Sequence, residues 1–319
     1  MTIPDAPDYE PYLRSSAVRH PYEHSRLIFA VGCLAVFFIV FLVIIFVAAS
    51  STGILLFLLA ILCVVGSAWL LIRTRNALLL GRAIKVTPES FPELHAEIVA
   101  LQLKVDYRRR LDVYVIDDVE GKMTVTNLLG TRVLLIEGGF AADLQAEGPA
   151  PLRFVLGRFI GWLKARHGRL ALFVIIVDHL KWLAVIDPWI LPYYRAAEYT
   201  CDQFGYLCAE HLDASLGVIA RLAVGKELGP GIAPTGVLEQ AQQVSWRPLS
   251  RYAELSQASP HLVKRYVNLV AFAASLKPAD YEGFRAGLNE KGRRLLGDLL
   301  IQSPHRRPSG AVPWPAGRR

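Results

Sequence analysis

Two long apolar segments near the start of the chain dominate its hydropathy pattern. Leu27 to Ala49 is almost wholly apolar and carries no charge, and a second uncharged run extends from Ile54 to Ile72. Each approaches the ~20 residues that an α-helix needs to cross a bilayer. Because only a short polar break separates the two runs, they predict a transmembrane helical hairpin. The first run is long and starts late, which argues against a cleaved signal peptide.

The basic residues around this hairpin predict its orientation. They lie on both sides of the hairpin and are absent from its turn: Arg14, Arg19 and Arg26 precede it, and Arg73, Arg75, Arg82 and Lys85 follow it. Since cytoplasmic flanks carry the excess of Lys and Arg, both ends of the hairpin are expected to face the cytoplasm. The pattern predicts a multi-pass protein of the inner (cytoplasmic) membrane, with its bulk domain in the cytoplasm.

Beyond the hairpin, apolar positions mostly recur with helical spacing. Helices are predicted over 92–105, 151–166, 194–211, 213–227, 233–246, 261–276 and 279–302. Two segments alternate like strands, Leu111 to Asp117 and Thr131 to Glu137, and the second ends at Gly138-Gly139. The expected fold class is therefore mainly α with a small β-sheet (α+β).

The segment from Leu170 to Tyr194 is strongly apolar but contains Asp178, His179 and Lys181. A charged group at mid-bilayer costs at least about 2.5 kcal/mol, so a simple span is disfavoured. We expect a short re-entrant or interfacial hairpin here. A buried helical hairpin within the cytoplasmic domain is the alternative.

These patterns divide the chain into four parts. The expected parts are a polar, irregular arm over 1–25, the hairpin over 26–73, a cytoplasmic domain over 74–302, and a basic, proline-containing tail over 303–319. The composition of the tail predicts disorder.

Composition and charge support a membrane protein. The hydrophobic fraction is 53% and the mean hydropathy +0.34, both high for a soluble chain. The net charge of +7 suits anionic lipid. No RNA- or DNA-binding signature is present in the sequence. The expected partners are therefore the lipid bilayer and another membrane protein or complex. An oligomer of this chain is compatible with the same composition. The four cysteines form no Cys-x-x-Cys pair, which predicts reduced thiols and disfavours a thiolate zinc site.

The strongest functional signal comes from two separate segments. One, over 157–167, reads Gly-Arg-Phe-Ile-Gly-Trp-Leu-Lys-Ala-Arg-His, and the other, over 195–205, reads Arg-Ala-Ala-Glu-Tyr-Thr-Cys-Asp-Gln-Phe-Gly. The second resembles the Glu-x-x-x-Asp helix of the HtpX-type, CAAX-prenyl-protease-like membrane zinc metallopeptidases, which are gluzincins. The first lies where those enzymes carry His-Glu-x-x-His. In this chain the three motif positions read Arg158, Phe159 and Trp162.

Weaker similarities extend the resemblance from the hairpin to about residue 275. Four segments resemble family segments in the same order: 90–95 (Ser-Phe-Pro-Glu-Leu-His), 113–117 (Val-Tyr-Val-Ile-Asp), 222–226 (Leu-Ala-Val-Gly-Lys) and 259–265 (Ser-Pro-His-Leu-Val-Lys-Arg). The family's Asn-Ala segment is not recognisable over 120–123. Since that segment helps bind substrate in active members, peptide binding is not implied.

In the family, two histidines at i and i+4 on one helix face hold zinc, and the intervening glutamate activates the zinc-bound water. A glutamate from a later helix completes the ligand set. The resemblance implies that Glu198 is a former zinc ligand, that Asp202 is its supporting carboxylate, and that His167 is a relic without a metal role. An ordinary surface helix is the alternative for Glu198 and Asp202.

The residues at the motif positions cannot perform this chemistry. Arg158 offers no lone pair, Phe159 accepts no proton, and the indole of Trp162 only donates. We therefore expect no bound zinc, no other cofactor and no peptidase activity. Because a buried carboxylate without metal needs another partner, the sequence predicts an Arg158–Glu198 ion pair. Phe159 and Trp162 are expected to fill the former cleft.

The expected function is that of a catalytically inactive membrane-anchored homologue, acting as a scaffold, binding or regulatory subunit of a membrane complex. Two alternatives remain. One is an active zinc metalloendopeptidase with non-standard ligands, in which at least two histidines or carboxylates converge with Glu198. The histidines His95, His179, His211 and His261 are scattered in the sequence, which disfavours a metal site rebuilt from them. The other is a purely structural accessory subunit that docks through its terminal segments.

Overall fold

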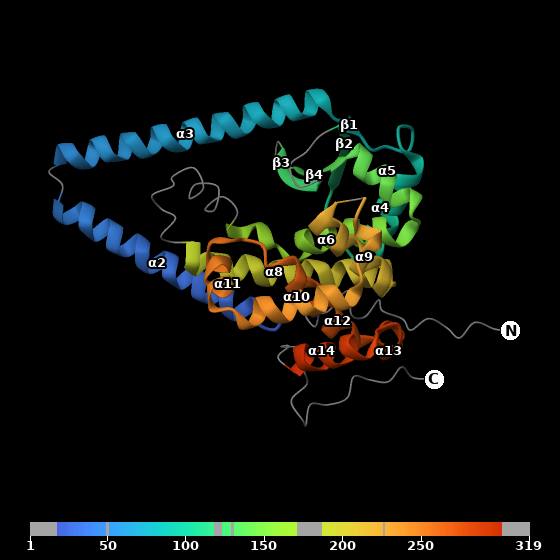
Figure 1. The fold of residues 1–319 in the computed structure, drawn as a ribbon. Helices are drawn as coiled ribbons and strands as arrows, with labels where there is room; N and C mark the ends of the chain where they lie inside the picture. The colour runs from blue at the N-terminus through green and yellow to red at the C-terminus, as the bar shows by residue number, and fades with distance from the viewer. Residues whose placement is uncertain are drawn as a thin grey trace. The chain divides into compact units, whose positions relative to one another are not determined.

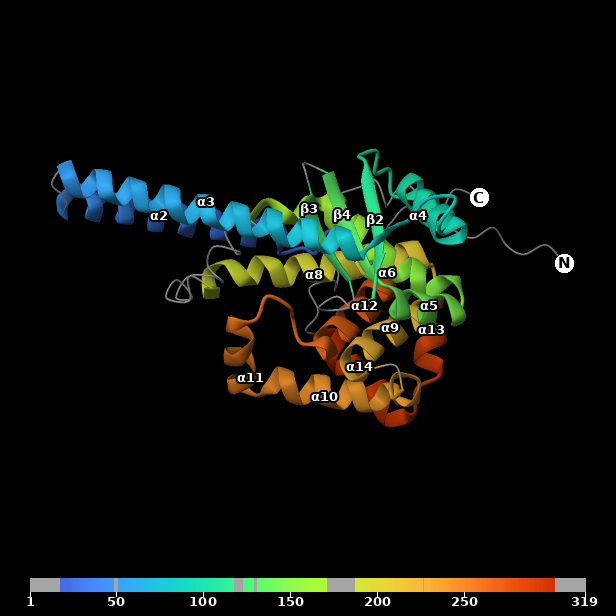
Figure 2. The ribbon, with the colours of Figure 1, turned by 90° about the horizontal axis from the view of Figure 1, so that it is seen from above.

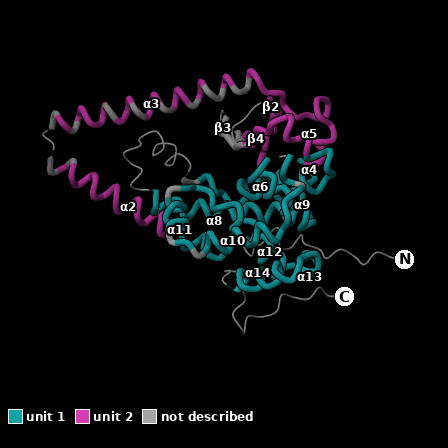
Figure 3. Tube along the Cα trace, viewed as in Figure 1, with its two compact units in different colours: residues 1–27, 98–108, 144–319 teal, residues 28–97, 109–143 magenta. Residues whose placement is uncertain are grey.

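The computed structural model describes residues 18–48, 51–117, 123–128, 131–170, 187–225 and 227–301, which form a mainly helical fold with a small sheet (Figure 1). This confirms the expected fold class at that level. The chain divides into two compact units (Figure 3). Unit 1 comprises residues 1–27, 98–108 and 144–319, and unit 2 comprises residues 28–97 and 109–143.

Both apolar segments near the start of the chain are helical. Helix α2 spans Glu23–Ala48 and α3 spans Ser51–Arg82. Among the described residues, one stretch is long and apolar enough to cross a membrane, Glu23–Ile44, and a shorter apolar run, Leu55–Leu71, lies in α3. Helix α2 begins four residues before the predicted Leu27, with the acidic Glu23 at its positive N-terminal end. The rings of Phe41 and Phe57 join the two helices, with centroids 5.6 Å apart.

The sheet belongs to unit 2 and has the order β1-β2-β4-β3. Its strands are β1 (Ile84–Lys85), β2 (Leu111–Ile116), β3 (Met123–Leu128) and β4 (Thr131–Glu137). Strand β4 pairs parallel with β2, placing Val113 opposite Leu134, and antiparallel with β3, placing Val125 opposite Leu134. Central strand β4 is buried on both faces, as Leu134 and Leu135 are 0% and 1% exposed.

The two predicted strands are confirmed, but strands β1 and β3 and the helix that follows β4 were missed. Strand β3 reads Met-Thr-Val-Thr-Asn-Leu, a short alternation that follows the five undescribed residues 118–122. Gly138-Gly139 ends β4 as predicted and also begins helix α5 (Gly138–Ala146). Helix α4 (Pro92–Lys104) matches its predicted range within one residue.

Unit 1 is built from helices around α12. Its helices are α6 (Pro149–Ala165), α8 (Asp187–Ala209), α9 (Leu212–Val224), α10 (Pro234–Trp246), α11 (Pro248–Ala253), α12 (Leu262–Leu276), α13 (Pro278–Ala286) and α14 (Glu290–Ile301), with 3₁₀ turns at His167–Leu170, Gly229–Gly231 and Glu254–Ser256. Helix α12 packs against α8, α9, α10, α13 and α14, and it buries every residue from Arg265 to Ala273 (Figure 2).

Two helix predictions need correction. The single helix predicted over 279–302 is two helices, because Asn289 caps α14 by accepting a hydrogen bond from Gly292 N at 2.7 Å. Helix α8 begins at Asp187 rather than Tyr194 and continues through Pro192. A proline in the second turn removes one backbone hydrogen bond, and the burial of Ile190 and Leu191 compensates.

Several predicted features lie outside the described residues. They are the arm over 1–17, most of the apolar segment (171–186), the segment over 120–122, and the tail over 303–319. From the predicted segment 170–194, residues 187–194 form the first two turns of α8.

Helices α6 and α8 approach unusually closely because glycines line their contact (Figures 1 and 2). A Cβ added at Gly161 would lie 2.4 Å from Phe204 Cβ, and one at Gly157 would lie 2.5 Å from Cys208 Cβ. From the other side, a Cβ at Gly205 would meet the Phe154 backbone oxygen at 2.7 Å. This spacing brings polar side chains of the two helices within hydrogen-bonding reach.

The residues just before the apolar part of α2 are anchored on unit 1. Arg19 donates to the Ala165 carbonyl at 3.2 Å, and His20 N donates to Thr200 Oγ1 at 2.9 Å. The Thr200 hydroxyl donates in turn to Glu23 Oε2 at 2.6 Å. The end of the predicted irregular arm is therefore a packed segment of the helical unit.

Candidate functional site

Four charged side chains from three helices meet beside the α6–α8 contact. Arg158 on α6 donates to Glu198 Oε2 through Nη2 at 2.7 Å, which confirms the predicted ion pair. Arg158 Nε also lies 2.7 Å from Asp202 Oδ1, although without the alignment of a hydrogen bond. Arg265 on α12 grips Asp202 with both ends of its fork, Nε to Oδ2 and Nη2 to Oδ1, each at 2.8 Å. We call these residues the Arg158 cluster.

Burial differs sharply within the Arg158 cluster. The side chain of Asp202 is fully buried, those of Arg265 and Arg158 are 6% and 12% exposed, and that of Glu198 is 30% exposed. Burial alone would lower the pKa of Arg265, but the charge and hydrogen bonds of Asp202 outweigh it and hold that pKa above its usual range. Helix α8 is not the surface helix of the alternative interpretation, since Phe204 and Tyr206 are also buried.

The arrangement neutralises both carboxylates with guanidinium groups. A metal ion at Glu198 and Asp202 would face the fixed positive charges of Arg158 and Arg265 at short range. Over the described ranges, no group of three or more His, Cys, Asp or Glu residues is placed to hold a metal ion. The loss of zinc stays a prediction.

The other two motif positions lie on the same helix as Arg158. Phe159 and Trp162 are both partly buried. The Trp162 ring packs over Gly168, where an added Cβ would lie 2.6 Å from Cη2. Helix α6 ends at Arg166, which lies between Trp162 and Gly168 in the sequence and has the left-handed conformation, with φ of 59°. That the two aromatic rings fill a former cleft stays a prediction.

His167 belongs to a different buried cluster. Its ring is fully buried, with Nε2 3.1 Å from Glu23 Oε1 and Nδ1 3.6 Å from Cys201 Sγ. It makes a T-shaped contact with the Tyr193 ring, with centroids 6.2 Å apart. These contacts give His167 a structural role in anchoring the start of α2.

Two of the remaining histidines also have structural contacts. His211 caps α9 by accepting a hydrogen bond from Ala214 N through Nδ1 at 3.2 Å. His261 Nε2 lies 3.3 Å from the Ser250 carbonyl oxygen. His179 lies outside the described residues.

The two cysteines on α8 are expected to resist modification in the folded protein. All four cysteines are free, and Cys201 and Cys208 are 3% and 1% exposed. Burial raises the pKa of Cys208 to about 12 and also raises that of Cys201, so neither thiol supplies a thiolate near neutral pH. Peptide mass mapping after maleimide treatment should find both unlabelled until denaturant is added. Leu249→Cys, at a position 82% exposed, provides the labelled control, and labelling of Cys201 at the same rate as that control would refute the burial.

Sequence reasoning singled out Arg158, Glu198 and Asp202 and missed Arg265, the fourth member of the Arg158 cluster. Arg265 ends the segment 259–265, whose resemblance to a family segment was the available signal. Comparison with known proteins found no matching family model, no matching curated protein and no matching solved structure. The resemblance to HtpX-type peptidases rests on the segments described above.

Proposed function

We propose that this chain is a catalytically inactive, membrane-anchored homologue of HtpX-type zinc metallopeptidases that acts as a binding or regulatory subunit of a membrane complex. One observation carries the proposal. Where the resemblance implies zinc beside Glu198, the guanidinium of Arg158 contacts both Glu198 and Asp202 at 2.7 Å. A permanent organic cation takes the electrostatic role of the metal and leaves no site for an activated water.

The loss of chemistry follows from the residue types. Peptide hydrolysis by the family mechanism needs a Lewis acid and a general base on the α6 face. Arg158 ligates no metal, and Phe159, one position on, accepts no proton. What remains is a helical framework held by an ion-pair cluster, which supports binding rather than catalysis.

Membrane anchoring is the second part of the proposal. The apolar side chains of α2 and α3 are strongly exposed; Phe46, for example, is 82% exposed and Leu55 69%. A continuous apolar surface of that kind is stable in lipid and unfavourable in water. With Arg and Lys on both flanks, we place the two helices across the inner membrane as a hairpin, with the remaining chain in the cytoplasm.

The decisive experiment is the zinc content of the full chain, purified in detergent and briefly chelated to remove adventitious metal. We expect mass spectrometry of the metal to give a value near zero per chain, and the same preparation to carry a stoichiometric membrane-protein partner. A value near one zinc per chain, together with peptide cleavage, would establish the alternative of an active enzyme with non-standard ligands.

A matched variant makes that measurement sharper. The triple change Arg158→His, Phe159→Glu and Trp162→His restores the motif that the resemblance implies. If Glu198 is a former ligand, this variant should retain zinc after the same chelation, and adding Glu198→Gln should remove it again. Failure of the triple variant to take up zinc while remaining folded would count against the metallopeptidase ancestry.

A further inference from the structure

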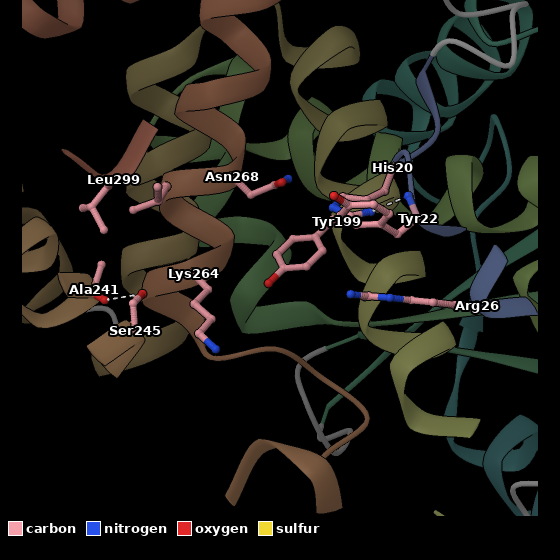
Figure 4. Close-up of a pocket in the computed structure, with 10 residues that line it drawn as sticks. His20, Tyr22, Arg26, Tyr199, Ala241, Ser245, Lys264, Asn268 and Leu299 are labelled. Atoms are coloured by element: carbon pink, nitrogen blue, oxygen red, sulfur yellow. Dashed lines mark hydrogen bonds between the residues drawn. The ribbon is translucent and has the colours of Figure 1, made fainter. Parts of the chain in front are cut away.

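A cavity in unit 1 has a volume of about 240 Å³ and shares no lining residue with the Arg158 cluster (Figure 4). The start of α2 and the helices α8, α10, α12 and α14 contribute to its walls. Its polar lining includes Arg26, Lys264, Tyr199, Asn268, Ser245 and His20. Figure 4 shows Arg26 and Lys264 approaching the Tyr199 hydroxyl from opposite sides.

Two cations give the cavity its charge. Arg26 donates to the Pro192 carbonyl at 3.3 Å and lies over the Tyr22 ring, and within the described part of the chain it has no carboxylate partner. Lys264 pairs with Glu254, which lies outside the lining. None of the described lining residues is Asp or Glu, so within the lining Arg26 faces no carboxylate, and the one acidic partner, Glu254 of Lys264, lies outside it.

Two neutral polar groups of the lining, on Asn268 and Tyr199, can also donate hydrogen bonds. Asn268 is only 7% exposed, and its side-chain amide nitrogen has no hydrogen-bond partner among the described residues. A buried donor without an acceptor is unfavourable unless a ligand or water supplies one. Burial raises the pKa of Tyr199, so its hydroxyl keeps its proton and donates as well. The Tyr199 ring is held in place by stacking on His20 at 5.0 Å.

We infer that this cavity binds a phosphate group. A guanidinium, an ammonium, a phenol and an amide N–H₂ together match the several acceptor oxygens of one tetrahedral oxyanion. Bound phosphate would satisfy Asn268 and would compete with Glu254 for Lys264. The volume is ample for a phosphate group and leaves room for part of the molecule that carries it.

Two sources share this chemistry. Arg26 is the fourth residue of α2, the helix with the apolar stretch Glu23–Ile44, so a phospholipid headgroup at the membrane surface is close to the cavity if α2 spans the bilayer. A free phosphate or small phosphate ester from the cytoplasm is the other source. The inference rests on the cavity and holds whether or not the chain is a pseudopeptidase.

The test uses the full chain in a neutral detergent with two probes. Inorganic phosphate is titrated by calorimetry, and phosphatidylglycerol is compared with phosphatidylcholine in lipid nanodiscs by native mass spectrometry. Saturable binding of inorganic phosphate supports a soluble source, and selective retention of phosphatidylglycerol without phosphate binding supports a lipid headgroup. Binding of neither probe overturns the inference.

Variants tie the binding to the cavity. Arg26→Gln should weaken the probe that binds by roughly 10- to 100-fold, the range for hydrogen bonds to charged groups. Asn268→Asp, which is nearly isosteric and adds negative charge, should weaken it at least as much. Lys291→Gln removes the same charge from an ion-paired side chain that is 67% exposed and should change nothing. Unaltered binding by folded Asn268→Asp protein would overturn the assignment even if Arg26→Gln failed to fold.

Discussion

Replacing Arg265 with methionine is expected to lower the free energy of unfolding by about 3–5 kcal/mol, the range for removing one partner of a buried ion pair. Asp202 is fully buried and receives two hydrogen bonds from Arg265 at 2.8 Å. After the substitution, Arg158 would remain as its cation, through a contact that lacks hydrogen-bond alignment. Denaturant unfolding of the full chain in detergent, followed by circular dichroism, measures the loss.

A double-mutant cycle separates the ion pair from simple packing. Asp202→Asn combined with Arg265→Met removes both charges, and it should be clearly more stable than Arg265→Met alone, because no unpaired carboxylate remains buried. A loss below about 1 kcal/mol for Arg265→Met, as for a solvent-exposed pair, would contradict the buried geometry.

The Arg158–Glu198 pair should respond differently. Glu198 is 30% exposed, so water already screens its charge and can solvate it when the partner is removed. Glu198→Gln is therefore expected to cost less than Arg265→Met. Arg265 is therefore expected to contribute more to stability than the Arg158–Glu198 pair.

Local sequence patterns were sufficient to predict a helix or strand where the residues of that element alone determine its structure. Helices α4 and α6 carry periodic signals and lie within two residues of their predicted ranges. The two uniformly apolar runs are also helical, although α3 continues to Arg82, ten residues beyond the predicted Ile72. Strand β3 was missed because its alternation covers only Met123 to Thr126 and breaks at Asn127. The break between α13 and α14 depends on the cap at Asn289, a single side chain within an otherwise helical pattern.

Part of the candidate site was likewise predictable from local sequence, and part depends on how the helices pack. Glu198 and Asp202 are i and i+4 on α8, so their shared face was predictable, and the demand of a buried carboxylate for a partner pointed to Arg158. Arg265 comes from α12, and its contact with Asp202 depends on how α12 packs against α8. The phosphate cavity combines residues as distant as Arg26 and Asn268, a proximity that only the tertiary fold creates.

The contact between α6 and α8 positions the Arg158 cluster, and the substitution Gly161→Ala tests this contact directly. The new methyl group would lie 2.4 Å from Phe204 Cβ, an atom fixed to the backbone of α8, so the helices must separate. Overpacking of this kind typically costs about 1–3 kcal/mol. The gain in helix propensity over glycine, about 1 kcal/mol, offsets only part of it. We expect a net loss of stability, measured by the same unfolding experiment.

Gly217→Ala is the matched control, because Gly217 is an exposed residue within α9 and an added Cβ meets nothing within 4 Å. It should be neutral or stabilising, since only the propensity term acts there. Equal effects of the two substitutions would mean that α6 and α8 are not in close contact.

The same contact between α6 and α8 holds Arg158 within 2.7 Å of Glu198 and Asp202, so Gly161→Ala should also weaken the ion pairs. The effects of Gly161→Ala and Glu198→Gln on stability should therefore be less than additive. Full additivity would separate the helix contact from the site.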